Sequence, residues 1–246
     1  MSMQESTLRR KAIAMRFSPV WIILLSAALY LGLQVYPVWT ILLLALLAAI
    51  AWVYKRKRAM TLKGVAPSLG FSYQRDAALD DIDVFSLNFH LFRQGDSKRI
   101  KNVMSGQRDG IAIRIFEYPN NRTMIFYAQY ATVLLLQSHK LDLPTFELRP
   151  KGLHHKIGGW FGQQGIHVDP HPAFSAMSLL QGADEQAIRA LFTHDMLSYF
   201  AKNNDICVVG WSHTLLVYRA GQCVSPHRMA SFLEEGLRIF ALFTTP

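Results

Sequence analysis

The chain has 246 residues, of which 51% are hydrophobic and only 17% are charged, with two cysteines and a formal net charge of +9. Because soluble domains average about 25% charged residues, this composition is short of charge. It excludes a disulfide-built mini-protein, a collagen-like chain and a wholly disordered one. The length allows a membrane segment followed by one domain of good size.

The positive charge gathers in the N-terminal part of the chain. Residues 1–63 carry a net charge of +8, whereas residues 64–246 carry +1. A nucleic-acid-binding domain spreads its basic surplus over its folded surface, but the surplus here flanks an apolar run. We therefore expect no nucleic-acid partner and assign the basic residues to the edge of a membrane, against anionic lipid headgroups. The predicted membrane-surface contacts are Arg9, Arg10, Lys11, Arg16, Lys55, Arg56, Lys57 and Arg58.

The apolar run predicts a transmembrane hairpin. Residues 20–54 contain no charged side chain. One straight helix of that length would measure about 52 Å, while the hydrocarbon core of a bilayer is about 30 Å thick. Tyr36-Pro37, near the middle, predicts a turn because proline lacks a backbone donor and disfavours helix at the residue before it. We therefore expect two transmembrane helices, residues 19–33 and 38–54.

The charge pattern also predicts the topology. Lysine and arginine concentrate on the cytoplasmic side of membrane helices, and both outer ends of the hairpin are basic. The predicted organisation is a basic cytoplasmic N-terminus (1–18), a transmembrane helical hairpin (19–54) and a cytoplasmic α+β domain (55–246). The protein is then a multi-pass membrane protein with both termini in the cytoplasm. A cleaved signal peptide and a buried hairpin in a soluble protein are the alternatives, but the chain stays apolar long after the small-residue motif at 26–28.

The first half of the domain is predicted to be rich in β-structure. Ile111, Ile113 and Ile115 alternate along one face of a strand, and Asp109-Gly110 before them predicts a tight hairpin turn. The β-branched and aromatic residues of 123–137 form the next strand. Together these residues predict an antiparallel meander of three strands, with a fourth candidate strand at residues 145–149.

The second half is predicted to contain more helix. Residues 184–192 and 195–202 are amphipathic helices, residues 206–211 and 214–218 form a hairpin, and a terminal helix runs from Ser225-Pro226 to about Leu242. In that last helix Glu234 and Arg238 stand four residues apart and are expected to pair. Cys207 lies among valines in a strand, which predicts a buried, inert thiol. Because strands and helices do not alternate one for one, the fold class is α+β, an antiparallel sheet with packed helices.

Several unusual strings also resemble a known family. They are residues 102–106 (Asn-Val-Met-Ser-Gly), 116–118, 143–150, 171–175, 179–185 and 189–192. In these strings the chain resembles a widespread bacterial family of membrane-anchored proteins whose activity is uncharacterised, and the resemblance covers most of residues 91–242. The resemblance implies a bacterial membrane protein and assigns no catalytic residue.

Three residues have the spacing of a metal-binding site. His167, Asp169 and His171 are spaced two apart on one side of an extended segment, and imidazole with carboxylate suits zinc or another divalent ion. The alternative is that these are ordinary histidines of a surface loop. The chain lacks a G-x-S-x-G motif, and we expect no cofactor.

Two functions follow from these observations. The first is a non-enzymatic membrane protein whose cytoplasmic domain binds a protein or lipid partner. The alternative is a membrane-anchored, metal-dependent hydrolase that uses His167, Asp169 and His171.

Overall fold

The computed structural model describes residues 19–35, 37–78, 91, 99–120, 129–151, 165–166 and 172–244. The chain divides into two compact units, Met1–Lys57 and Arg58–Pro246. The first unit contains helix α2 (Pro19–Val35) and the apolar part of α3 (Pro37–Ser68). Both helices begin at a proline, the residue that best tolerates the first helical position. The last part of α3, from Arg58 onward, belongs to the second unit.

Helix α3 is much longer than the predicted helix of residues 38–54. It continues through the basic run, because lysine, arginine, methionine, leucine and alanine all favour helix, and it ends at Ser68. Its most apolar 18-residue stretch has a mean hydropathy of 2.0, and none of that stretch is buried. Among the described residues it is the one helix both long and apolar enough to span a bilayer. Helix α2 has 17 residues, at the short limit for a span, so the predicted two-span hairpin is not shown.

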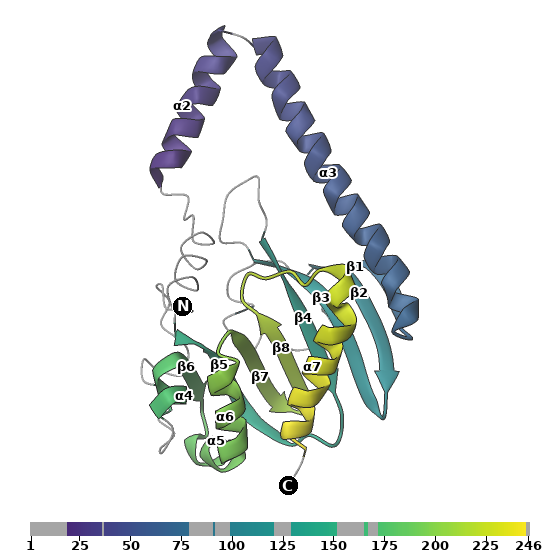
Figure 1. Cartoon of the computed structure of the whole chain (residues 1–246), viewed down its shortest axis with the longest axis vertical. Helices are drawn as coiled ribbons and strands as arrows, with labels where there is room; N and C mark the ends of the chain where they lie inside the picture. Colours follow the sequence, from purple (N-terminus) through teal and green to yellow (C-terminus); the bar gives the residue numbers. More distant parts are fainter. Residues whose placement is uncertain are drawn as a thin grey trace, which may run out of the picture. The chain divides into compact units, whose positions relative to one another are not determined.

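The second unit is built on one eight-stranded sheet in which all neighbouring strands are antiparallel (Figure 1). The order of the strands across the sheet is β1-β2-β3-β4-β8-β7-β5-β6. Their bounds are β1 Ser72–Ala78, β2 Arg99–Arg108, β3 Ile111–Asn120, β4 Gln129–Gln137, β5 Leu143–Pro150, β6 Ser178–Gly182, β7 Ile206–Ser212 and β8 Thr214–Arg219. The α+β class is confirmed. The predicted fourth strand does not extend the meander, because β8 pairs with β4 while β5 pairs with β6 and β7.

The turn between β2 and β3 forms where the sequence predicts it. Asp109 and Gly110 both have positive φ angles, 52° and 78°. Two-residue hairpin turns of this kind match the twist of the flanking strands, and glycine and aspartate tolerate the left-handed backbone better than most residues. The turn places Ile111, Ile113 and Ile115 on one face of the sheet, where all three are buried.

Helices cover that face of the sheet. The helices are α4 (Pro172–Met177), α5 (Glu185–Leu191), α6 (His194–Lys202), a 3₁₀ turn η3 (Pro226–Arg228) and α7 (Met229–Leu242). In Figure 1, α6 and α7 lie in front of the strands. Buried side chains from α5, α6, α7 and the end of α3 join one apolar cluster with the isoleucines of β3. Leu62 and Ala66 of α3 are fully buried in this cluster, so the end of α3 is part of the domain core.

The opposite face of the sheet carries a second buried cluster. Alternate residues of the same strands form it, including Phe116 and Tyr118 of β3 and Leu216 and Tyr218 of β8. A sheet with two buried faces explains why residues 133–136 of β4 and residues 215–218 of β8 are apolar and buried without interruption.

Two glycines in helices give a matched test of packing. Gly64 of α3 has open space where a Cβ would be, whereas a Cβ on Gly236 of α7 would lie 1.9 Å from Cδ2 of the buried Leu134. We expect Gly64→Ala to raise the free energy of unfolding by about 0.5–1 kcal/mol, because alanine is the better helix former. Gly236→Ala should instead lower it by about 1–3 kcal/mol through overpacking. Thermal unfolding of the full chain in detergent would measure both, and an equal effect of the two substitutions would contradict this account.

Candidate functional site

The basic run at the centre of α3 divides into two kinds of residue. Lys55, Arg56 and Lys57 are exposed, and the Arg56 guanidinium lies 5.0 Å from the centre of the Trp52 ring. A cation over an indole face is a favourable arrangement at an interface between apolar and aqueous phases. The other predicted surface residues, Arg9, Arg10, Lys11 and Arg16, lie outside the described residues.

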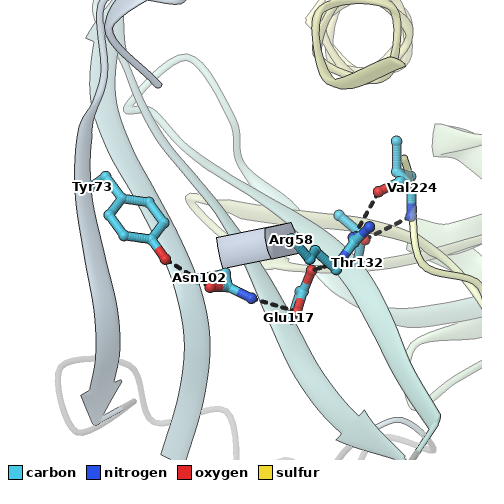
Figure 2. Close-up of polar contacts among 6 residues, drawn as sticks. All are labelled: Arg58, Tyr73, Asn102, Glu117, Thr132 and Val224. Carbon is cyan, nitrogen blue, oxygen red and sulfur yellow. Dashed lines mark hydrogen bonds and ion pairs between the residues drawn. The ribbon is translucent and has the colours of Figure 1, made fainter. Parts of the chain in front are cut away.

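Arg58 departs from the prediction that it contacts lipid headgroups. Its side chain is only 14% exposed, and its Nε donates to Oε1 of Glu117 at 2.6 Å, while Nη2 donates to the carbonyl oxygen of Val224 at 2.7 Å (Figure 2). The Glu117 side chain is 6% exposed. Arg58 is the first residue of the folded unit and follows Lys57 directly. The basic run therefore ends in an ion pair inside the domain.

Glu117 also anchors a chain of polar contacts across the first three strands. Its Oε2 accepts a hydrogen bond from Nδ2 of Asn102 at 2.7 Å, and Oδ1 of Asn102 accepts one from the Tyr73 hydroxyl at 2.7 Å (Figure 2). Partial burial, more than the Glu117 charge, raises the pKa of Tyr73, so this hydroxyl remains a donor at neutral pH. We refer to Arg58, Glu117, Asn102 and Tyr73 as the Arg58 network.

The backbone at Asn102 explains how its side chain reaches both partners. Asn102 has a φ of 50°, and the register between β2 and β3 shifts between Lys101 and Met104. Such a bulge inserts an extra residue and redirects side chains, and asparagine accepts the left-handed conformation more readily than most residues. The bulge thus turns the Asn102 amide toward Glu117.

The loop that precedes η3 is tied to the same place. Val224 donates its N–H to Oγ1 of Thr132 at 2.8 Å, and Thr132 donates its own N–H to the carbonyl of Gln222 at 3.0 Å. Since the Val224 carbonyl also accepts from Arg58, residues 222–224 are held between α3 and β4 (Figure 2). The Arg58 network joins α3, three strands and this loop.

Glu117 was not among the predicted site residues, although the sequence carries a signal for it. Strand alternation puts Glu117 on the same face as Ile111, Ile113 and Ile115, where a lone carboxylate needs a partner. The identity of the partner could not be read from the sequence, because Arg58 lies 59 residues away.

The predicted metal ligands His167, Asp169 and His171 lie outside the described residues. Within the described ranges, no group of three His, Cys, Asp or Glu side chains could hold a metal ion. The metal site therefore stays a prediction from the sequence.

A second polar group lies beneath the opposite face of the sheet. Cys207 and Tyr218 stand opposite each other on β7 and β8, and Glu147 and Arg149 of β5 lie near enough to affect their ionisation. Burial, followed by the charge of Glu147, raises the pKa of the Cys207 thiol to about 12. The predicted burial of Cys207 is confirmed, since the side chain is fully buried, and its inertness stays a prediction.

The two cysteines should differ sharply in reactivity. Cys223 is exposed, whereas Cys207 is buried with a raised pKa, and the thiolate is the reactive form. We expect one equivalent of a maleimide reagent to react with the native protein between pH 7 and 9, and a second only after unfolding. Because the thiol pKa is higher in the folded state, the stability that the neutral thiol contributes is complete below about pH 9 and is lost as the pH rises toward 12. Labelling of Cys207 at the rate of Cys223 would contradict this assignment.

No model of a known protein family matches the chain, and a search of curated proteins finds no match. The crystal structure of the mycobacterial trehalose monomycolate transport factor A is similar, with 22% sequence identity and a TM-score of 0.49. The match covers 77% of this chain and 93% of that one. At this level the likeness does not extend to function.

Proposed function

We propose that this chain is an inner-membrane protein of bacteria whose cytoplasmic α+β domain binds a protein or lipid partner at the membrane. In this proposal α2 and α3 both cross the bilayer, and both termini are cytoplasmic. The apolar, unburied stretch of α3 and the exposed basic residues that follow it support the membrane location. Kinship with the uncharacterised bacterial family stays a prediction.

The unbroken course of α3 carries the proposal. The same helix contains the apolar stretch, the exposed Lys55–Lys57 run and Leu62, which is fully buried in the domain core. Leu62 is the fifth residue after Lys57, about 7.5 Å further along the helix. The helix runs without a break between these two points, and the Arg58–Glu117 ion pair fixes the first turn of the domain. A domain joined so closely to a basic flank is suited to act on molecules at the bilayer surface.

Reporter fusions test the topology. Alkaline phosphatase is active only outside the cytoplasm. Green fluorescent protein fused to a membrane protein is fluorescent only when it stays in the cytoplasm, because it does not become fluorescent after export in the unfolded state. A fusion after Val38 should give phosphatase activity, because α2 has then crossed once. A fusion after Pro246 should give fluorescence and no phosphatase activity. An inactive phosphatase after Val38 would show that α2 does not cross, and an active one after Pro246 would place the domain outside the cytoplasm.

Purification tests partner binding. We expect the full chain, extracted in mild detergent, to retain either a stoichiometric protein or bound lipid in native mass spectrometry. A chain that carries neither from any extraction would contradict the binding function. The hydrolase alternative predicts bound zinc or another divalent ion that is lost from a His167→Ala, His171→Ala variant.

A further inference from the structure

A hollow of about 500 Å³ lies on the helical side of the domain, along η3 and α7. The loop before η3, including Cys223 and Val224, forms one wall, and residues of α7 form another. This is the loop that the Arg58 network holds against β4. One wall of the hollow is therefore bonded to Arg58, the first residue of the domain.

The charges around the hollow are unevenly distributed. Its two acidic side chains, Asp205 and Glu235, both pair with Arg219: Nε to Oδ2 of Asp205 at 2.8 Å, and a two-pronged contact to Glu235 at 2.7 and 2.8 Å. The hydrogen bonds to Glu235 raise the pKa of Arg219 further, so its guanidinium stays charged. Both carboxylates that line the hollow are therefore paired with Arg219.

Two other arginines remain on the walls. Arg228 and Arg238 are exposed, line the hollow, and form no hydrogen bond or ion pair with any other residue that the structure describes. The sequence predicts that Arg238 pairs with Glu234, but that prediction is wrong, because Glu234 binds Arg108 of β2 at 2.7 Å. Both guanidiniums are therefore available to an anion.

Hydroxyl donors lie beside these arginines. Ser225 and Ser231 also line the hollow, and the Ser225 hydroxyl makes a hydrogen bond of 3.3 Å with Nε2 of the neighbouring, exposed His227. Guanidinium groups with nearby hydroxyls are the donors that typically bind a phosphate. The volume exceeds what a phosphate ion needs and accommodates a small headgroup attached to one.

We propose that this hollow binds the phosphate-bearing headgroup of an anionic phospholipid, with Arg228 and Arg238 as the charged ligands. The inference rests on the proposed function, because that function holds the domain at a membrane, where phospholipid phosphates are present. It adds a lipid class and named residues to that function.

Protection of Cys223 from alkylation reports occupancy, because this exposed thiol lies in the wall of the hollow. The full chain is placed in phosphatidylcholine nanodiscs, and three probes are compared: soluble dihexanoyl phosphatidylglycerol, inorganic phosphate, and nanodiscs that contain phosphatidylglycerol. We expect soluble phosphatidylglycerol at ten times its Kd to slow alkylation about tenfold, because only the empty fraction reacts. Phosphatidylglycerol in the nanodisc should also slow it, and inorganic phosphate should have a much weaker effect.

Variants separate this site from general surface charge. In native mass spectrometry we expect one phosphatidylglycerol molecule bound to the unaltered chain. Arg228→Gln with Arg238→Gln should abolish both this binding and the protection of Cys223, whereas Arg108→Gln, on β2, should leave both unchanged. Equal protection by inorganic phosphate would overturn the lipid headgroup as the ligand. No protection by any probe would overturn the site while leaving the membrane topology intact. Protection by the soluble lipid but not by the nanodisc lipid would instead contradict the proposed position of the domain at the bilayer.

Discussion

Replacing Glu117 with alanine is expected to lower the free energy of unfolding of the domain by about 3–5 kcal/mol. The substitution leaves the Arg58 guanidinium mostly buried with one carbonyl partner, and it also removes the acceptor of the Asn102 amide. Breaking one side of a buried ion pair costs far more than the pair contributes, because the remaining charge keeps its desolvation penalty. Denaturant unfolding of the full chain in detergent, followed by near-UV circular dichroism, measures the loss.

A second ion pair supplies the control for this prediction. Arg108 and Glu234 form a contact of 2.7 Å, against 2.6 Å for Arg58 and Glu117, but both of their side chains are at least half exposed. Arg108→Ala should leave the free energy of unfolding essentially unchanged, since exposed pairs contribute little. If Glu117→Ala has no larger effect than Arg108→Ala, the Arg58 network does not stabilise the domain. Glu117→Gln should give an intermediate loss, because the amide oxygen can still accept one hydrogen bond.

Replacing Phe146 with alanine should have an effect of similar size, about 3–5 kcal/mol. Phe146 is fully buried, its ring stacks on Phe243 at 5.5 Å and meets the edge of Phe192 at 5.2 Å. The backbone of Gly210 packs directly against the same ring, where a Cβ would lie 2.3 Å from Cε1. Truncation therefore leaves a cavity among rigid rings and strand backbone, which cannot collapse to fill it.

The comparison for this second prediction uses a smaller change and an exposed site. Phe146→Leu should cost clearly less than the alanine substitution, because most of the cavity stays filled. Met177→Ala, at a side chain that is 47% exposed, should change the free energy of unfolding little. A loss below about 1 kcal/mol for Phe146→Ala would show that β5 and the helical layer are not packed as described.

The features of the fold that could be predicted are those set by residues close together in the sequence. The Asp109-Gly110 turn follows from two adjacent residues. The terminal helix follows from apolar residues at helical spacing, of which Met229, Leu233 and Phe240 are buried and Leu237 is partly buried. The burial of Cys207 follows from its apolar neighbours. Each of these features depends on residues close together in sequence, whose preferences act whatever the rest of the chain does.

Long-range pairing could not be predicted in the same way. The insertion of β8 beside β4 joins strands far apart in the chain, and strand periodicity gives the faces of a strand but not its neighbours. The length of α3 was underestimated because the apolar run ends near Tyr54, whereas helix propensity continues through the basic residues. The Arg58 network combines both difficulties, since it needs the full length of α3 and the bulge at Asn102.

The place of β8 in the sheet also sets the order of events during synthesis. Strand β4 is complete at Gln137, but its partner β8 ends only at Arg219, about 80 residues later. At a ribosomal rate of about 5–20 residues per second, the apolar edge of β4 stays unpaired for several seconds until β8 has been synthesised. Such an edge invites pairing with other nascent chains. The apolar stretch of α3 leaves the ribosome before β4, so under the proposed function its insertion into the bilayer separates each nascent chain from the next during that interval.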